Sequence, residues 1–333
     1  MTKRLLLTVL ICFEIATAQA QDPQFSQFYA NPIYLNPAFA GSVRCPRLAL
    51  NYRNQWPGLN KTYITISASY DQHVDALGGG VGLMIMNDKA GNGTLNSTAV
   101  SGVYAYSLNI SRNFTIRAGL QATYMQERLD FDKLTFGDQI DPRYGYVYAT
   151  QEDRPNEKHG FADFSGGMVA YSSKVYGGFA VHHLTEPDQA FIVQGSSPLP
   201  RKITAHLGAL LPLKGSSTYK GRMEGTFLSP NVLYQQQQGF NQLNLGMYII
   251  KTPIIGGLWY RGYLNGKSFL SSDSFIALIG IQKELFKFGY SYDITVSRLS
   301  NNVSGGSHEV SFGMQFECRP KKKRFKAISC PTF

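Results

Sequence analysis

The residues whose types could support catalysis are two adjacent histidines, His182 and His183, and two serines shortly before them, Ser172 and Ser173. A serine activated by a histidine, which a carboxylate or amide orients, performs acyl transfer, and a membrane enzyme would direct such a set at lipid. Adjacent side chains on an extended strand point to opposite faces, so only one of the two histidines could serve that site. We expect no catalytic residue here and interpret the histidines as polar residues at the end of a strand.

A metal site is not predicted either. Cys45, Cys318 and Cys330 follow the first twenty residues, and they form no CxxC pair and no Cys/His set with the spacing of a zinc site. An odd number of cysteines in an oxidising compartment suggests one disulfide with a spare thiol, or an intermolecular bond. We therefore expect no metal and no other cofactor.

The N-terminus predicts export. Lys3 and Arg4 precede the apolar run 5–13, and Ala18-Gln19-Ala20 supplies small residues for cleavage, so residues 1–20 resemble a secretory signal peptide. No later stretch approaches the ~18 consecutive apolar residues of a spanning helix. Because an exported protein does not meet nucleic acid, the net charge of +10 points instead to lipid headgroups, cell-wall polymers or an acidic protein face.

Strict period-two alternation repeats along most of the remaining chain and predicts strands. Between Phe286 and Val296 the even positions are mostly aromatic or aliphatic and the odd positions are small or polar, and 114–124 and 64–71 repeat the pattern. Strands that cross a bilayer need about 9 to 11 residues with apolar side chains toward lipid. A water-soluble sandwich is the alternative, but its strands average about 5 to 6 residues.

The sequence thus predicts an all-β fold: a transmembrane outer-membrane β-barrel of about fourteen antiparallel strands over residues 47–317. The expected strands are 47–55, 61–72, 77–88, 94–109, 112–128, 160–172, 174–184, 200–212, 221–234, 240–251, 254–263, 270–282, 284–298 and 307–317. Tight connectors alternate with longer ones, and such barrels keep the tight turns in the periplasm. Both termini are therefore expected in the periplasm. The run 275–279 is apolar on both faces and indicates a lumen that is partly plugged or packed.

Two segments lie outside the predicted strands. Residues 21–46 contain three Asx-Pro dipeptides, which favour turns. Between them lie five aromatic residues: Phe25, Phe28, Tyr29, Tyr34 and Phe39. This segment either packs in the periplasmic mouth of the barrel or contacts a partner. Residues 318–333 form a basic tail, expected in the periplasm, which is either solvated or a docking surface. Its candidate contact residues are Lys321, Lys322, Lys323, Arg324 and Phe333.

The N-terminal segment also carries a long motif. Residues 21–28, QDPQFSQF, and 31–41, NPIYLNPAFAG, closely resemble the start of the PorP/SprF family of type IX secretion and gliding-motility membrane proteins. The residues RNQW at 53–56 and the C-terminal CPTF also resemble that family, and the resemblance covers the whole mature chain. Residues 59–62 depart from it, since a more Pro- and Gly-rich sequence is expected there.

The resemblance implies a non-enzymatic outer-membrane protein of Bacteroidota. Some members are linked to a periplasmic ring or a cell-wall-binding lipoprotein of the type IX machinery. Others serve the secretion and anchoring of large surface adhesins with a C-terminal sorting domain. The expected function is noncovalent docking of an adhesin, of periplasmic machinery, or of both, within outer-membrane lipid. A passive porin is the alternative, and a lipid-acting barrel enzyme is a more distant one.

The predicted barrel carries two further expectations. The longest outer connector, 129–159, contains Tyr144, Tyr146 and Tyr148, which alternate and would extend a hairpin above the membrane as a contact for cargo. Barrel closure brings the position before the first strand near the position after the last. We therefore expect a disulfide of Cys330 with Cys45 or Cys318, with three reduced thiols as the alternative.

Overall fold

The structure of the protein, a computed structural model, describes residues 22–59, 63–111, 113–152, 156–191, 195–213, 215, 217–219, 222–265, 268–297 and 301–317. Most of these residues belong to one antiparallel sheet. Its barrel strands, in chain order, are β1 (Arg47–Gln55), β2 (Tyr63–Val74), β3 (Gly79–Ala90), β4 (Leu95–Asn109), β5 (Thr115–Leu129), β8 (Lys158–Tyr171), β9 (Val175–His182), β10 (Lys202–Ala209), β14 (Thr226–Gln237), β15 (Phe240–Lys251), β16 (Ile254–Asn265), β17 (Ser268–Lys283), β18 (Phe286–Thr295) and β19 (Ser307–Gln315).

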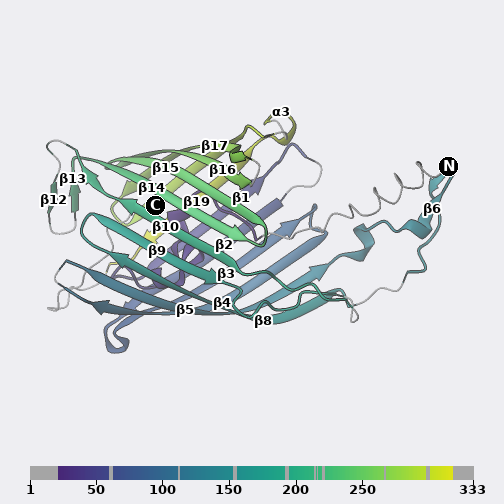
Figure 1. Ribbon diagram of the computed structural model, residues 1–333, viewed down its shortest axis with the longest axis horizontal. Coiled ribbons are helices and arrows are strands. Elements are labelled where there is room, and N and C mark those ends of the chain that lie inside the picture. Colours follow the sequence, from purple (N-terminus) through teal and green to yellow (C-terminus); the bar gives the residue numbers. More distant parts are fainter. Residues whose placement is uncertain are drawn as a thin grey trace.

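The sheet closes on itself (Figure 1). Each barrel strand pairs with the next along the chain, β10 pairs with β14, and the last strand, β19, pairs with the first, β1. The sheet contains fifteen strands, but β11 (Leu211–Pro212) only continues the line of β10 along β14. Fourteen strands therefore form the ring. The predicted antiparallel barrel of about fourteen strands is confirmed. No helix among the described residues is both long and apolar enough to cross a membrane.

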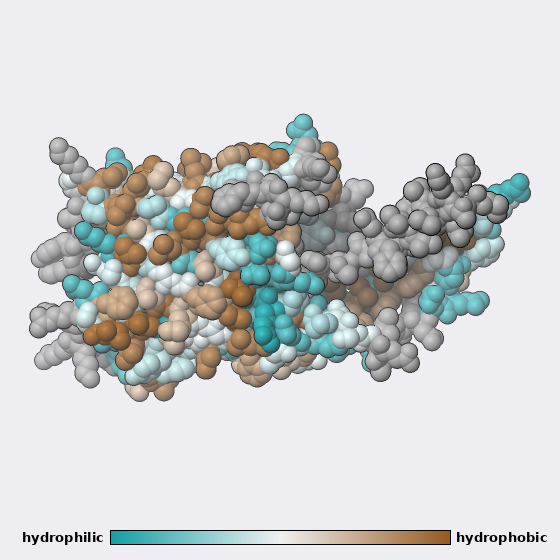
Figure 2. Space-filling model, in the orientation of Figure 1, coloured by the Kyte–Doolittle hydropathy of each residue, from teal (hydrophilic) through white to brown (hydrophobic). Residues whose placement is uncertain are grey.

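The alternation of the sequence places apolar side chains on the outside of the ring. On β5, Leu120 is 69% exposed whereas Arg117 is 1% exposed, and on β18, Phe288 is 49% exposed whereas Ser291 is fully buried. This is the reverse of a water-soluble sandwich, whose apolar side chains face inward. Figure 2 shows brown, apolar side chains gathered over the barrel wall. The arrangement is that of a barrel surrounded by lipid.

The two ends of the barrel differ in their connectors. The long-connector end includes the connector between β5 and β8, the connector between β9 and β10, and α3 (Asn301–Ser304). The first of these contains the 3-10 helices η4 (Phe131–Lys133) and η5 (Gly137–Gln139) and a hairpin of β6 (Ile140–Asp141) and β7 (Gly145–Tyr146). The short-connector end carries tight turns, η3 (Asp75–Leu77), and one longer connector with the hairpin of β12 (Ser217–Tyr219) and β13 (Arg222–Glu224). Figure 1 shows β6 and β12 at opposite ends of the molecule.

The N-terminal segment forms three short helical turns inside the barrel: η1 (Phe28–Ala30), α2 (Pro32–Leu35) and η2 (Pro37–Phe39). Two Asn-Pro pairs start the last two turns, because proline at the first helical position needs no hydrogen-bond acceptor for its nitrogen. The Asn36 side chain accepts a hydrogen bond from the Ala38 backbone N–H at 2.9 Å and so caps η2. Its amide also donates to the carbonyl oxygens of Met168 and Phe179, at 3.1 and 3.2 Å, which ties the turn to the barrel wall.

The segment runs through the lumen from one end to the other. Asp22 contacts Gln237, the last residue of β14, at the long-connector end. Gly41 donates its backbone N–H to Asp71, near the short-connector end of β2, at 2.7 Å. The sequence analysis left open whether this segment packs in the mouth of the barrel or contacts a partner, and in the structure its packing extends along the lumen. Aromatic and aliphatic side chains along its whole length find their packing partners only if the segment stays inside the ring.

Two glycines on the inner wall make room for the segment. Gly119 on β5 and Gly167 on β8 lie opposite each other in the strand register. A Cβ atom on Gly119 would collide with the backbone of Pro37 and Ala38, and one on Gly167 would collide with the Asn36 side chain. The backbone of η2 therefore approaches the wall more closely than any other residue type would allow.

We expect Gly119→Val to destabilise the folded barrel by roughly 1 to 3 kcal/mol, because the added methyl groups occupy the volume of η2. The matched control is Gly102→Val on β4, where an added Cβ would have no neighbour within 4 Å. The midpoint of heat unfolding, followed by the change in gel migration of the folded barrel, compares the two variants. Equal midpoints for both would contradict the close packing of η2 on β5.

Candidate functional site

Ser26 of the N-terminal segment lies among four buried charged side chains from four different strands. They are Arg53 of β1, Arg261 of β16, Asp293 of β18 and Glu309 of β19, none of which is more than 4% exposed. We call Ser26 and these four residues the Ser26 cluster. Two cations and two anions make the cluster neutral overall. Buried charges are stable only when they are paired and hydrogen-bonded, which the cluster achieves by gathering them around one hydroxyl.

The distances within the Ser26 cluster are those of direct ion pairs. Arg53 Nη2 lies 2.9 Å from Asp293 Oδ2, and Arg53 Nη1 lies 3.3 Å from Glu309 Oε2. Arg261 Nη1 lies 3.1 Å from Asp293 Oδ2. The Ser26 hydroxyl donates to Asp293 at 2.6 Å and accepts from Arg53 at 2.6 Å and from Arg261 at 2.9 Å. One donor and two acceptor positions are all that a hydroxyl has, so this serine is fully used.

Two arginines hold the segment at the short-connector end. Arg47 forms a bidentate pair with Asp71, with Nε to Oδ1 at 2.9 Å and Nη2 to Oδ2 at 3.0 Å. Arg117, 1% exposed, donates from Nε to the Ala38 carbonyl at 2.9 Å and from Nη2 to the Ala40 carbonyl. Arginine presents several donors in a fixed plane, which suits it to bind neighbouring carbonyl oxygens. Arg117 thus binds the backbone of the segment directly, whereas the Arg47–Asp71 pair holds it through the backbone N–H that Gly41 donates to Asp71.

Asp22 anchors the segment at the long-connector end. Its Oδ2 lies 2.9 Å from His183 Nε2 and 3.4 Å from Lys202 Nζ, and its Oδ1 accepts from Gln237 Nε2 at 3.1 Å. The other ring nitrogen of His183, Nδ1, lies 2.9 Å from Asp163 Oδ2. His183 therefore bridges a carboxylate of the segment and a carboxylate of the wall, which a ring protonated on both nitrogens does best.

His183 is the first residue of the connector after β9. Burial disfavours its charged form, but the carboxylates of Asp22 and Asp163 outweigh burial and raise the pKa of His183 to about 9 from its ordinary value of 6.5. Because the folded-state pKa is the higher one, the ion pairs contribute fully below about pH 6.5 and are lost as the pH rises through about 9.

The aromatic side chains of the segment pack against the inner wall. Phe28 contacts Trp259 edge to face at 5.1 Å between ring centroids, Tyr29 contacts Tyr176 at 5.7 Å, and Phe39 stacks on His206 at 5.4 Å. Phe25 meets Tyr34 edge to face at 5.2 Å, and the Lys202 ammonium lies 5.0 Å from the Tyr34 ring centroid. Such contacts add stability beyond the area that they bury.

This packing bears on one of the two alternatives that the sequence analysis left open. The sequence analysis offered Phe25, Phe28, Tyr29, Tyr34 and Phe39 as contacts for a periplasmic partner. Phe25, Phe28, Tyr29 and Phe39 are at most 5% exposed, and Tyr34 is half-buried. They are occupied by the barrel and are not presented at its surface, because the wall of this lumen offers them aromatic and aliphatic partners.

The candidate catalytic residues are not brought together. Ser172 and Ser173 lie in the tight turn before β9, whereas His183 follows the other end of that strand. His183 is engaged by Asp22 and Asp163, and His182 is buried on the inner wall. Among the residues that the structure describes, no group of three His, Cys, Asp or Glu side chains is arranged to hold a metal ion.

The predicted hairpin above the long-connector end is present. β6 and β7 pair antiparallel, and Tyr144, Tyr146 and Tyr148 are 73%, 63% and 56% exposed. The Tyr148 hydroxyl donates to Asp141 Oδ2 at 2.8 Å, and the Thr150 hydroxyl donates to Asp138 Oδ2 at 2.9 Å. Figure 1 shows this part of the chain standing far beyond the rim of the barrel. We call residues 134–152 the arm.

The remaining candidates lie at the C-terminus. The basic residues Lys321, Lys322, Lys323 and Arg324, together with Phe333, lie outside the described residues, as do Cys318 and Cys330. Cys45 is disulfide-bonded. Its pairing with Cys330, and the alternative pairing of Cys330 with Cys318, stay predictions.

Sequence reasoning missed the residues that hold the segment. Arg53, Asp293 and Glu309 all occupy inward positions of strands with clear alternation. A charged residue at an inward position was therefore the sequence feature that could have identified them. The sequence does not show which strands lie close together in space when they are far apart in the chain. Only closure of the ring brings Arg53 and Glu309 opposite each other.

Comparisons with known proteins agree with these observations. The family described as "Type IX secretion system membrane protein PorP/SprF" matches residues 17–314. No curated protein sequence matches the chain. Among solved structures, the toluene transporter TbuX of Ralstonia pickettii is 9% identical, with a TM-score of 0.48 and coverage of 86% of this chain and 93% of that one. Omp33 of Acinetobacter baumannii is 8% identical, with a TM-score of 0.45 and coverage of 83% and 100%. Likeness at this level says nothing about function.

We expect Asp293→Asn to release the segment, because the change leaves two buried arginines with one carboxylate, at a cost of about 3 to 5 kcal/mol. The wild-type barrel should be closed in planar bilayers, and the variant should show single-channel openings and a lower unfolding midpoint. The control is Arg201→Met, which removes an exposed ion pair with Glu186 at 3.4 Å and should cost about 0 to 1 kcal/mol. Equal conductance in wild type and Asp293→Asn would contradict this role.

The bridge formed by His183 predicts a pH dependence. Raising the pH from about 6.5 to above 9 should remove up to about 3 kcal/mol of stability from the wild-type barrel, because the ring loses its charge between two carboxylates. In His183→Gln the loss over this range should be smaller by that amount. Urea unfolding at a series of pH values measures both proteins, and parallel curves would count against the bridge.

Proposed function

The chain belongs to the PorP/SprF family of type IX secretion system membrane proteins, and on that premise we propose that it is a closed docking platform of the outer membrane. In this proposal the barrel is a frame, the arm at the long-connector end holds a secreted surface adhesin by noncovalent contact, and the short-connector end faces the periplasmic machinery. The observation that carries the proposal is the combination of an occupied lumen with an exposed aromatic arm.

The occupied lumen supports docking over passive diffusion. A porin keeps its lumen open to water. In this chain the segment from Asp22 to Gly41 passes along the inside of the barrel and is held near both ends and in between by buried ion pairs and hydrogen bonds. A small cavity of about 60 Å3 remains beside it, next to Tyr34 and Gln121. For the barrel to act as a porin, the segment would therefore have to leave the lumen.

The arm supports contact with a protein. Its exposed apolar residues include Ile140 and Val147 in addition to the three tyrosines, with exposures of 48% to 73%. Tyrosine is enriched at the centres of protein interfaces, because it buries a large area with few rotatable bonds. The short hairpin also has free strand edges, which suit the addition of a strand from a partner.

The opposite end supports a second contact. The connector between β10 and β14 is longer than the other turns at that end and carries the β12/β13 hairpin. Strand β19 ends at the same end of the barrel, and we propose that the basic residues 318–333, which follow it in the sequence, meet an acidic face of a periplasmic ring or cell-wall-binding lipoprotein. In this proposal both the long-connector arm and the tail act at once, on opposite sides of the membrane.

We expect the double variant Tyr144→Ser/Tyr146→Ser to retain at least about tenfold less surface protein in pull-downs from native membranes, because interface tyrosines often contribute about 2 kcal/mol or more each. Barrel insertion, checked by gel migration, should not change. Tyr148→Phe is the control, because it keeps the ring and removes only the hydrogen bond to Asp141. Undiminished retention by the double variant would contradict docking through the arm.

A further inference from the structure

Four side chains form a row across the outer wall at the long-connector end. In the strand register, Ile64 of β2 lies opposite Lys89 of β3, Lys89 lies opposite Asn96 of β4, and Asn96 lies opposite Arg128 of β5. Residues that lie opposite one another share a face of the sheet. We call these four residues the outer row. Its neighbour on β5, Glu127, is buried on the inner side, so the outer row faces away from the lumen.

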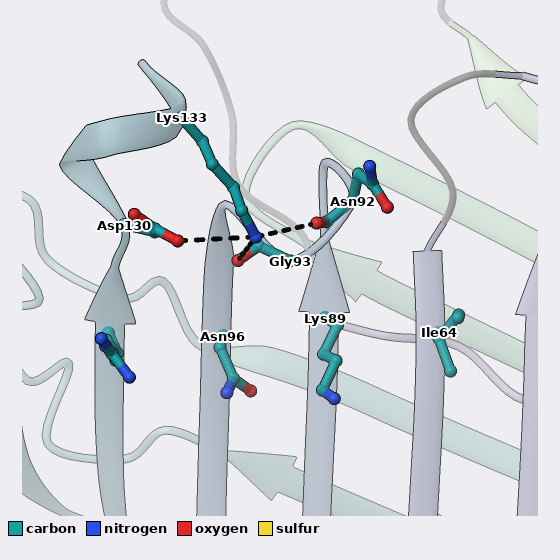
Figure 3. A pocket seen from close by; sticks show the side chains of 8 residues that line it. Ile64, Lys89, Asn92, Gly93, Asn96, Asp130 and Lys133 are labelled. Atoms are coloured by element: carbon teal, nitrogen blue, oxygen red, sulfur yellow. Dashed lines mark hydrogen bonds and ion pairs between the residues drawn. The ribbon is translucent and has the colours of Figure 1, made fainter.

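The outer row forms the wall of a pocket (Figure 3). The pocket has a volume of about 400 Å3. Above the row, the pocket is lined by Asn92 and Gly93 of the β3–β4 turn and by Asp130 and Lys133 from the start of the 130–157 connector. The pocket therefore lies where the lipid-facing wall meets the loops.

Lys133 fixes the roof of the pocket. Its ammonium donates to the backbone carbonyl oxygens of Asn92 at 3.3 Å and Gly93 at 3.5 Å, and lies 3.5 Å from Asp130 Oδ2. Figure 3 shows this side chain reaching from η4 across to the turn. These contacts join the two connectors that lie above the outer row.

The pocket is positively charged. It contains three cationic side chains, Lys89, Arg128 and Lys133, and one carboxylate, Asp130. Arg128 also lies 3.4 Å from Glu157, but both side chains are about half exposed, so water screens this pair. Arg128 can therefore turn to an anion in the pocket, and with Lys89 it offers both a planar guanidinium and a compact ammonium.

The outer wall changes from polar to apolar over the two rows below the outer row, and on β2 the exposed Ile66 already lies in the first of them. Two positions further along the strands lie the amide and hydroxyl of Asn87 and Thr98, joined by a hydrogen bond of 2.9 Å. Two positions further again lie Ile85, Val100 and Tyr124, which are 54%, 48% and 56% exposed. This sequence of rows marks the boundary of the hydrocarbon layer.

The height of the pocket above that boundary fits a lipid headgroup. Two residues advance about 7 Å along a strand, or about 5 Å along the membrane normal when strands tilt by about 40°. The outer row thus lies about 10 Å above the last apolar row. Each headgroup layer adds roughly 5 to 8 Å to the hydrocarbon core. The outer row therefore lies near the outer edge of the headgroup layer, and the long side chains of Lys89 and Arg128 can extend from it down to lipid phosphates.

We propose that this pocket binds the phosphate of an anionic lipid in the leaflet at the long-connector end. Lys89 and Arg128 contact the phosphate, and the acyl chains lie on Ile85, Val100 and Tyr124. An acidic peptide would also match the charge, but the pocket lies on the lipid-facing wall and exposed apolar side chains begin two rows below it, which suits a molecule with a charged head and an apolar tail. The site would hold the base of the arm at a fixed height in the membrane.

The test uses the full chain in detergent micelles and counts bound lipid by native mass spectrometry. Phosphatidylglycerol is the anionic probe, and phosphatidylcholine and inorganic phosphate are the comparisons. The double variant Lys89→Gln/Arg128→Gln should bind phosphatidylglycerol at least about tenfold more weakly than wild type, because each basic residue contributes about 1 kcal/mol to such contacts. Wild type should bind phosphatidylcholine more weakly than phosphatidylglycerol.

A matched control removes the same charge from the opposite end of the barrel. Lys174→Gln/Lys251→Gln changes two exposed lysines there and should leave phosphatidylglycerol binding unchanged. Equal binding by wild type and the Lys89/Arg128 variant overturns the proposal, as does an equal loss in the control. If inorganic phosphate displaces the lipid at comparable concentration, the pocket is a site for free anions and the lipid assignment is wrong.

Discussion

The interior of this barrel depends on the neutralisation of charges that its own strands place on the inner wall. Arg53 and Arg261 face inward with Asp293 and Glu309, and Ser26 of the segment contacts three of these side chains directly. An unpaired charge in such a place costs several kcal/mol. The Ser26 hydroxyl and backbone N–H add hydrogen bonds from the segment to the charged groups of the wall.

The same alternation serves two different surfaces. Outward positions supply the apolar belt that lipid covers, and inward positions supply arginines, carboxylates and glycines that receive the segment. Gly119 and Gly167 show how specific this inner surface is, since they admit a backbone where a side chain would not fit. With the inside committed to the segment, the parts left to meet other molecules are the ends and the outer wall.

The barrel was predictable from the sequence because period two is a local property, visible within any ten residues. The fourteen strands and the hairpin at Tyr146 follow from that pattern and from turn residues. The segment was recognised as non-strand from its Asn-Pro pairs, but its path was not, because the contacts of Ser26 and Asp22 lie far away in the chain. The outer row was likewise out of reach, since Lys89 and Arg128 meet only through the registers of three neighbouring strands.

The hydrogen bond between Ser26 and Glu309 joins positions 283 residues apart, and Arg53 meets the same carboxylate across the junction of the first and last strands. A chain that has not yet been extended through β19 offers neither contact. Non-local contacts of this kind form late, after the loop between them has been closed. A chain shortened before its last strand would therefore keep Arg53 without Glu309, and we expect its N-terminal segment to lack the attachment that the finished barrel provides.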